Sequence, residues 1–344
     1  MKNYLFHILH KKNSVDLIRL LCTAGLLISL ANAQKTASGF LKTEKTIVLS
    51  VKGRIDHMDV NLKNQIVYVS ALGNNSLEVV DIAEGKVIRS ITGLNEPQGV
   101  GYIPQTNEIL VANGGTGDCY FYNARSFEKT GTIHLNSDAD DVRYDSASGK
   151  IYVGYGDGGI AVIDAVSHKQ LEDIKLPAHP ESFQIDRTLN LLFVNVPDAH
   201  MVGVVDLKKS YLIKKWARAI PAANFPMALD TINHRVFVGY RHPARLIAYE
   251  GSSGQQLVDM DMTGDADDLY YDNGTSFVYV SGGSGSISIY RIANGTVSKQ
   301  IATIPTRNGA RTSLLIPQLK LFVLAERADA GKPADLLIYK TEAN

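Results

Sequence analysis

Reactive side chains gather most clearly in two identical acidic segments, DADD at 138–141 and again at 265–268. Clustered carboxylate oxygens suit a hard cation such as Ca²⁺, or a cationic ligand. The spacing is not that of an EF-hand loop, and aspartates of this kind also accept hydrogen bonds from the amides of their own turn. The segments therefore predict either a binding site or two tightly held loops.

Histidine and acidic residues occur together at two further places, His179 with Glu181 and Asp198 with His200. Imidazole and carboxylate groups can hold a divalent cation, and either can act as a general base. The candidate metal ligands are His179, Glu181, Asp198 and His200, and the candidate catalytic residues are His57, His179, Glu181 and His200. The spacing matches no named metal motif, and a histidine in a polar loop often has no chemical role.

Arginines form a third group, because Arg143, Arg241 and Arg311 stand in or beside polar segments of the same kind. A guanidinium group suits a carboxylate or a phosphate, although each arginine can equally form a salt bridge with a nearby aspartate. Together, the arginines and the acidic segments predict a polar, funnel-shaped binding site that contains both positive and negative charges. The expected ligand-binding residues are His57, Asp59, Gln98, Asp140, Asp141, Arg143, Asn224, Arg241, Asp267, Asp268 and Arg311.

A sevenfold repeat positions these residues. A short β-branched and aromatic run recurs with its third residue, the anchor, at Tyr68, Leu110, Tyr152, Phe193, Phe237, Tyr279 and Phe322, which lie 41 to 44 residues apart. Each repeat reads as four short strands, and four strands in about 42 residues predict one blade of a β-propeller. The seventh repeat stops after its third strand, and the unassigned run at 46–51 is the expected donor of the missing outer strand. We therefore predict an all-β fold: a seven-bladed propeller of four-stranded antiparallel blades, closed by an N-terminal strand.

The repeat also sorts the innermost strand into two sets of positions. Residues ten and eight before each anchor are mostly apolar, and we assign them to the core between blades. Residues eleven and nine before each anchor are polar or small, and we expect them around the mouth of the central channel. The two DADD segments lie three repeats apart, about 154° around a sevenfold ring, so they are expected to face each other across that mouth.

The repeat pattern resembles the YVTN-repeat, YncE-like family of exported seven-bladed β-propellers. The segments KIYVGYGDGGIAVID (150–164) and LLFVNVPDAHMVGVVD (191–206) match it most closely, and the resemblance covers about residues 46 to 340. It implies the fold and says little about activity, since propellers host both binding and catalysis. The Gly-His and Trp-Asp marks of WD40 repeats are absent, and a single Trp disfavours a Trp-rich quinone-cofactor propeller.

The beginning of the sequence is typical of a secretory signal peptide at 1–33: four basic residues, an apolar run from 20 to 31 and an Ala-Asn-Ala ending. We expect a linker at 34–45, a single propeller domain at 46–344, and no membrane span after cleavage. The whole chain has 35 Lys and Arg against 35 Asp and Glu, so 31 against 34 remain after residue 33. Nucleic-acid binding through bulk positive charge is therefore not expected.

These features predict an exported, periplasmic or extracellular monomer that binds a small polar or anionic ligand, or a protein partner, in its polar funnel. Cofactors other than a divalent cation are not suggested. The alternative is a lactonase-like hydrolase or a lyase, with or without a metal ion, acting on an anionic substrate at the same funnel. The sequence contains no recognised catalytic triad, zinc signature or phosphate loop that would decide between binding and catalysis.

Overall fold

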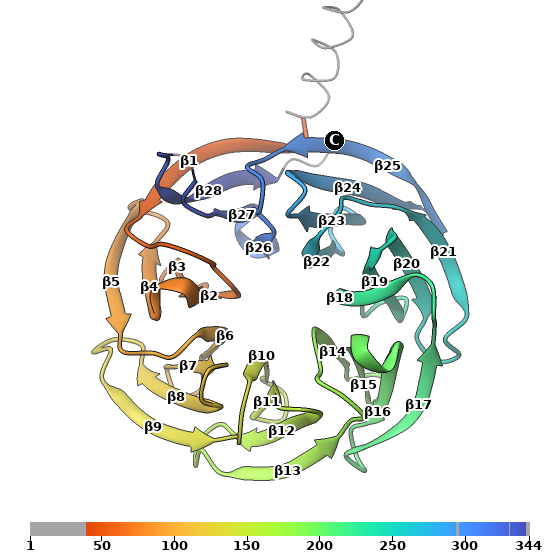
Figure 1. The fold of residues 1–344 in the computed structure, drawn as a ribbon, viewed down its shortest axis with the longest axis horizontal. Coiled ribbons are helices and arrows are strands. Elements are labelled where there is room, and N and C mark those ends of the chain that lie inside the picture. The colour runs from red at the N-terminus through yellow and green to blue at the C-terminus, as the bar shows by residue number, and fades with distance from the viewer. Residues whose placement is uncertain (1–38, 294–295, 330, 342–344) are drawn as a thin grey trace, which may run out of the picture.

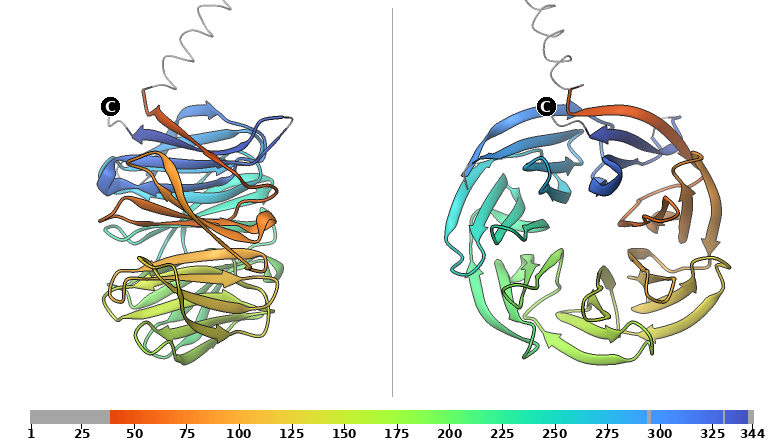
Figure 2. Two further views of the ribbon diagram at one scale, coloured as in Figure 1. Left: turned by 90° about the vertical axis from the view of Figure 1, so that its left-hand side faces the viewer. Right: turned by 180° about the vertical axis from the view of Figure 1, so that it is seen from behind.

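The computed structural model of the chain describes residues 39–293, 296–329 and 331–341. Seven four-stranded antiparallel sheets surround a central axis as the blades of a β-propeller (Figure 1). Viewed from behind, the blades again form one closed ring (Figure 2). The predicted all-β propeller fold is therefore confirmed. The signal-peptide prediction falls outside the described residues.

The blades are numbered in chain order, and their strands run from the axis outwards. Blade 1 consists of β2 (Met58–Asn61), β3 (Ile66–Ala71), β4 (Ser76–Asp81) and β5 (Lys86–Thr92), and blade 2 of β6 (Pro97–Ile103), β7 (Glu108–Asn113), β8 (Asp118–Asn123) and β9 (Lys129–His134). Blade 3 consists of β10 (Ala139–Asp145), β11 (Lys150–Tyr155), β12 (Gly159–Asp164) and β13 (Gln170–Lys175). Blade 4 consists of β14 (Phe183–Asp186), β15 (Leu191–Val196), β16 (Met201–Asp206) and β17 (Tyr211–Ala217).

Blade 5 consists of β18 (Ala222–Asp230), β19 (Arg235–His242), β20 (Ala244–Glu250) and β21 (Gln256–Asp261). Blade 6 consists of β22 (Ala266–Asp272), β23 (Phe277–Gly282), β24 (Ser286–Ala293) and β25 (Thr296–Pro305). Blade 7 consists of β26 (Thr312–Ile316), β27 (Leu321–Glu326), β28 (Ala334–Thr341) and β1 (Leu41–Leu49). The short 3₁₀ helices η1 (Leu72–Asn74), η2 (Pro197–Ala199) and η3 (Pro317–Leu319) lie in turns. None of the helices in the described ranges has the length and apolar character needed to cross a membrane.

The N-terminal strand closes the ring as predicted, because β1 pairs antiparallel with β28 and supplies the outer strand of blade 7. It begins at Leu41 instead of the expected residue 46, so it includes part of the segment expected to be a linker. Ile47 and Leu49 are buried against blade 1, whereas Val48 between them is exposed. This alternation is what a strand with one buried face requires.

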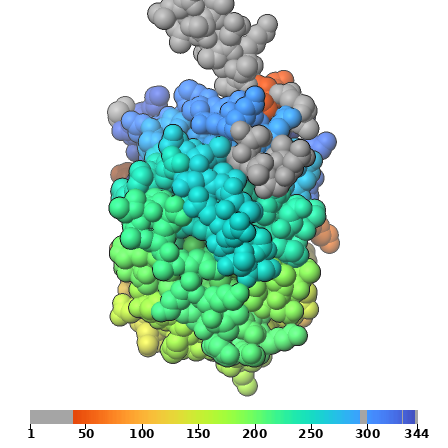
Figure 3. Space-filling view, turned by 90° about the vertical axis from the view of Figure 1, so that its right-hand side faces the viewer, coloured from red at the N-terminus to blue at the C-terminus, as the bar shows by residue number. Residues whose placement is uncertain are grey.

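The core is divided among the interfaces between blades. The described residues form seven clusters of buried apolar side chains, and each cluster draws on two neighbouring blades. The residues ten before each anchor take part as predicted: Met58, Val100, Val142, Phe183, Met227 and Leu269 are all buried in these clusters. Figure 3 shows successive blades following one another along the rim. Burying apolar side chains between blades is thus what holds the ring together.

The acid or amide at the end of most third strands has a local reason. The Asp164 carboxylate accepts hydrogen bonds from the amides of Val166 and Ser167 in the following turn. Asp206 does the same for Lys208 and Lys209. A short polar side chain that caps its own turn fixes the connection to the outer strand, which explains the recurring VID and VVD motifs without invoking a ligand.

Candidate functional site

A cavity of about 220 Å³, here called the funnel cavity, lies at one mouth of the central channel. Every blade contributes to its lining, which consists of Arg54, Gln98, Asp138, Asp140, His179, Glu181, Phe225, Arg241, Asp267 and Arg311. The two DADD segments meet in this cavity, as expected. A larger hollow of about 900 Å³ lies on the opposite face between blades 6 and 7, but it is lined by turn residues such as Asp272, which caps its own turn. Reactive groups converge only on the funnel cavity among the hollows described here.

Bulges in the innermost strands create this convergence. In β6, β10, β18 and β22 one extra residue interrupts the pairing with the second strand, just where the strand reaches the mouth. Strict alternation would turn the residue twelve before the anchor towards the interface between blades. A bulge redirects a side chain, so Gln98, Asp140, Phe225 and Asp267, all at that position, line the cavity instead.

This geometry corrects the prediction that the residues eleven and nine before each anchor surround the mouth of the channel. Of the residues eleven and nine before the anchors, only Arg311 lines the cavity; apart from Arg241, the other lining residues stand twelve or fourteen before their anchors. Asp59, Asp141 and Asp268 instead reach the next blade, where their carboxylates accept the backbone amides of Tyr102, Phe183 and Ser313 respectively. Burial raises the pKa of Asp59 to about 6 and that of Asp268 to about 7. These three aspartates join innermost strands to one another.

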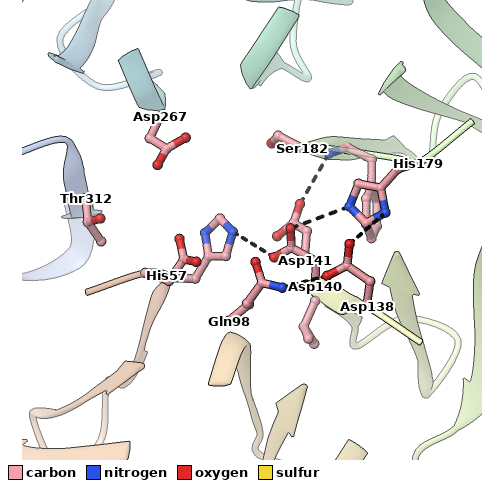
Figure 4. A network of polar contacts seen from close by, with 12 residues as sticks. His57, Gln98, Asp138, Asp140, Asp141, His179, Ser182, Asp267 and Thr312 are labelled. Atoms are coloured by element: carbon pink, nitrogen blue, oxygen red, sulfur yellow. Dashed lines mark hydrogen bonds and ion pairs between the residues drawn. The ribbon is translucent and has the colours of Figure 1, made fainter. Parts of the chain in front are cut away.

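Asp140 lies between two histidines on one side of the cavity (Figure 4). Its Oδ1 atom is 3.4 Å from Nε2 of His57, and its Oδ2 atom is 3.8 Å from Nε2 of His179. The other ring nitrogen of His179, Nδ1, donates to the carbonyl oxygen of Gly156 at 2.7 Å, and it lies 3.6 Å from Asp138. Gln98 donates to Asp138 at 2.8 Å and holds that carboxylate at the edge of the group.

The two histidines are held in the charged form. Burial alone lowers the pKa of His179, but the contacts with Asp140 and with the Gly156 carbonyl oxygen raise it overall to about 9. For His57, burial is again outweighed by Asp140 and the neighbouring carboxylates, and the pKa lies well above its ordinary value. Burial alone raises the pKa of Asp140, yet its two histidine partners hold it well below the usual range. One buried carboxylate thus stabilises two imidazolium groups.

Arginine and aspartate alternate on the other side of the cavity. Arg241 donates to Asp267 and, at 2.8 Å, to the carbonyl oxygen of Ala266, while its guanidinium stacks 3.7 Å from the centroid of the Phe225 ring. Arg311 contacts Asp265 at 2.7 Å and Asp267 at 2.9 Å. In blade 1, Arg54 lies 2.9 Å from Asp56.

The Glu181 carboxyl group faces the same cavity from the segment before β14. Burial raises its pKa to about 8, and the negative charges of Asp140 and Asp267 act in the same direction, against the weaker opposing effects of His179 and Arg241. At neutral pH Glu181 is therefore mainly an uncharged acid beside an ionised Asp140.

Other predicted site residues lie outside the funnel cavity. Asn224 in β18 is buried and donates to the Asn195 side chain and to the Met201 carbonyl oxygen, so its amide joins strands of blades 4 and 5. Arg143 is paired with Asp141 inside the channel wall. His57 is not among the lining residues and reaches the cavity through Asp140.

The predicted metal ligands are not brought together. Asp198 and His200 are exposed in and after η2, whereas His179 and Glu181 face the funnel cavity. Within the described part of the chain, no group of three or more His, Cys, Asp or Glu side chains is placed to hold a metal ion. The reason is that η2 ends with His200 in a left-handed conformation at the surface.

His179 and Glu181 were predicted as catalytic or metal-binding candidates, but three lining residues were in none of the predicted sets: Arg54, Asp138 and Phe225. Arg54 and Asp138 stand fourteen residues before their anchors, as does His179, and Phe225 stands twelve before. A comparison of these two positions across repeats would have found all three residues. Strict β alternation pointed to the neighbouring positions because it assumes an unbroken strand.

Comparisons with known proteins agree with the architecture. No protein-family model matches the chain, and no curated protein matches its sequence. Among solved structures, a chain of hydrazine synthase from Kuenenia stuttgartiensis has a TM-score of 0.73 at 13% identity, covering 86% of this chain and 99% of that one. A chain from the crystal structure of the mitotic checkpoint complex has a TM-score of 0.74 at 14% identity, covering 87% and 92%. Likeness at such identity shows the fold alone, a WD40-like seven-bladed β-propeller.

Proposed function

We propose that the protein is an exported binding module of the YVTN-repeat, YncE-like type, and that its funnel cavity holds a small anionic ligand. The observation on which this proposal depends is the set of N–H donors around the cavity. A guanidinium group has five N–H donors, and the contacts of Arg54, Arg241 and Arg311 with neighbouring residues use only some of them. The remaining donors favour a ligand rich in acceptor oxygens.

The charge of the lining supports the same ligand class. With Glu181 uncharged, the lining residues carry Arg54, Arg241, Arg311 and protonated His179 against Asp138, Asp140 and Asp267, a formal surplus of one positive charge. A volume of 220 Å³ has room for roughly seven water molecules. That size suits a small metabolite better than a protein segment, and export is supported by the N-terminal sequence pattern.

Calorimetric titration tests this proposal with acetate, lactate, malate, citrate and inorganic phosphate, and with glucose and ethanolamine as neutral and cationic probes. At least one anion is expected to bind, and Arg241→Gln together with Arg311→Gln is expected to weaken that binding at least tenfold. Arg245→Gln is the matched control, because Arg245 lies in the same hairpin but pairs with Asp259 and Asp261. Binding of glucose or ethanolamine alone, or equal affinities in all variants, would contradict the proposal.

One observation favours the hydrolase or lyase alternative, namely the opposite pKa displacements of Glu181 and Asp140 in one cavity. Such a split pair can supply a general acid beside an ionised group. A pH-stat assay with a panel of lactones tests it, with Glu181→Gln expected to slow turnover by about 100-fold or more. Turnover no faster than in buffer would remove this candidate for the lactones assayed.

A further inference from the structure

Glu181 differs from the other acidic groups of the funnel cavity in having no partner of its own. Its side-chain carboxyl group makes no hydrogen bond and no ion pair with any residue in the described ranges. The two cations that act on it electrostatically are already paired: His179 faces Asp140, and Arg241 donates to Asp267. A third carboxylate in the same small cavity therefore lacks a counterion.

The groups that face Glu181 come from several blades. Asp140 approaches from β10 and Asp267 from β22, while His179 lies in its own segment and Arg241 at the end of β19. The two carboxylates disfavour a further negative charge, and burial acts in the same direction. Glu181 therefore presents an O–H donor to the cavity at neutral pH.

An O–H donor and guanidinium donors in one cavity suit the same kind of ligand. A carboxylate oxygen can accept a strong, charge-assisted hydrogen bond from a carboxylic acid and further bonds from a guanidinium group. The formal surplus of one positive charge in the lining matches a monoanion better than a dianion. Once ionised, Glu181 loses its donor and adds a like charge against such a ligand.

We propose that Glu181 is a ligand-binding residue that donates a hydrogen bond to a small monocarboxylate, so that the funnel holds this anion only while Glu181 carries its proton. This inference rests on the proposed anion-binding function. It adds a ligand class, the monocarboxylates, and a means of release, which is ionisation of Glu181. Binding is then coupled to the protonation state of one side chain.

The test is calorimetric titration with acetate, lactate and pyruvate between pH 6.5 and 9.5. In the wild-type protein the Kd of a bound monocarboxylate is expected to rise at least tenfold between pH 7 and pH 9, because Glu181 titrates at about pH 8. Glu181→Gln keeps an N–H donor without an ionisable group, so its Kd is expected to rise only about twofold, through loss of the His179 proton. Glu96→Gln is the control for an exposed acid outside the cavity lining and should keep the wild-type profile.

Each outcome decides between the two proposals. A flat wild-type profile, or the same steep profile in Glu181→Gln, overturns the role of Glu181 while anion binding stands. Binding of malate, citrate or phosphate without any monocarboxylate also overturns this inference alone. If no anion binds at pH 6.5, the proposed function fails with it. Proton uptake on binding, measured by repeating the titration at pH 8 in Tris and in a second buffer of different ionisation enthalpy that is not itself a candidate ligand, must be larger in the wild type than in Glu181→Gln, where only His179 takes up a proton; equal uptake overturns the role of Glu181.

Discussion

Replacing Asp140 by Asn probes the group on which the funnel cavity depends. The substitution keeps the shape of the side chain but removes the negative charge that lies 3.4 Å from His57 and 3.8 Å from His179. Both imidazolium groups then lose their shared partner. Because a histidine can release its proton, the cost of this loss depends on pH.

The direction of this pH dependence follows from the pKa of His179, which is about 9 in the folded protein and about 6.5 in an unfolded chain. A raised histidine pKa stabilises the fold fully below pH 6.5, and that stabilisation is lost as the pH rises through 9. The difference corresponds to about 3 kcal/mol, and His57 adds in the same direction. We expect Asp140→Asn to lower the free energy of unfolding by about 3 kcal/mol at pH 6 and by clearly less at pH 9.5, where His179 has lost most of its charge.

Urea denaturation at the two pH values measures this difference. The single tryptophan, Trp216, packs between Phe193 and Tyr249 at 5.4 Å from each ring centroid, and its fluorescence reports unfolding of blades 4 and 5. Asp138→Asn is the control: its carboxylate is half-exposed and should cost less than about 1 kcal/mol at either pH. An equal cost of Asp140→Asn at pH 6 and pH 9.5 would refute the shared-charge reasoning.

Two further substitutions test the packing that shapes the cavity. Gly99→Ala would place a Cβ atom 1.9 Å from the Asp140 carbonyl oxygen, so the bulge of β10 that carries Asp140 must move. We expect this variant to bind anions at least tenfold more weakly, measured by calorimetry. Gly264→Ala is the control: its Cβ atom would have its nearest contact at 3.5 Å, so the variant should bind like the wild type. Asn224→Ala removes buried hydrogen bonds between blades 4 and 5 and should lower the urea-unfolding free energy by about 2 kcal/mol without changing anion affinity; a large affinity loss would restore Asn224 to the ligand site.

The ring architecture was predictable because it repeats. Seven copies of one hydrophobic pattern average out local irregularities, so the number of blades, the strand that closes the ring and the buried positions ten before each anchor all followed from spacing. The polar groups of the funnel were also assigned to the correct face. What the pattern misplaced was the position within the innermost strand, since Asp140 and Asp267 line the cavity while Asp141 and Asp268 bind neighbouring backbone amides.

That misplacement has a physical origin. Periodicity in a sequence reports which residues avoid water over many blades, and it assumes a regular strand. A bulge adds one residue to one strand and turns the following side chains to another direction, and nothing in the local alternation announces it. The same holds for charge: the composition of the chain is balanced at 35 against 35. The fold alone brings Asp140 between two histidines and leaves Glu181 without a counterion, because His57 and His179 come from other blades and lie 83 and 39 residues from Asp140 in the chain.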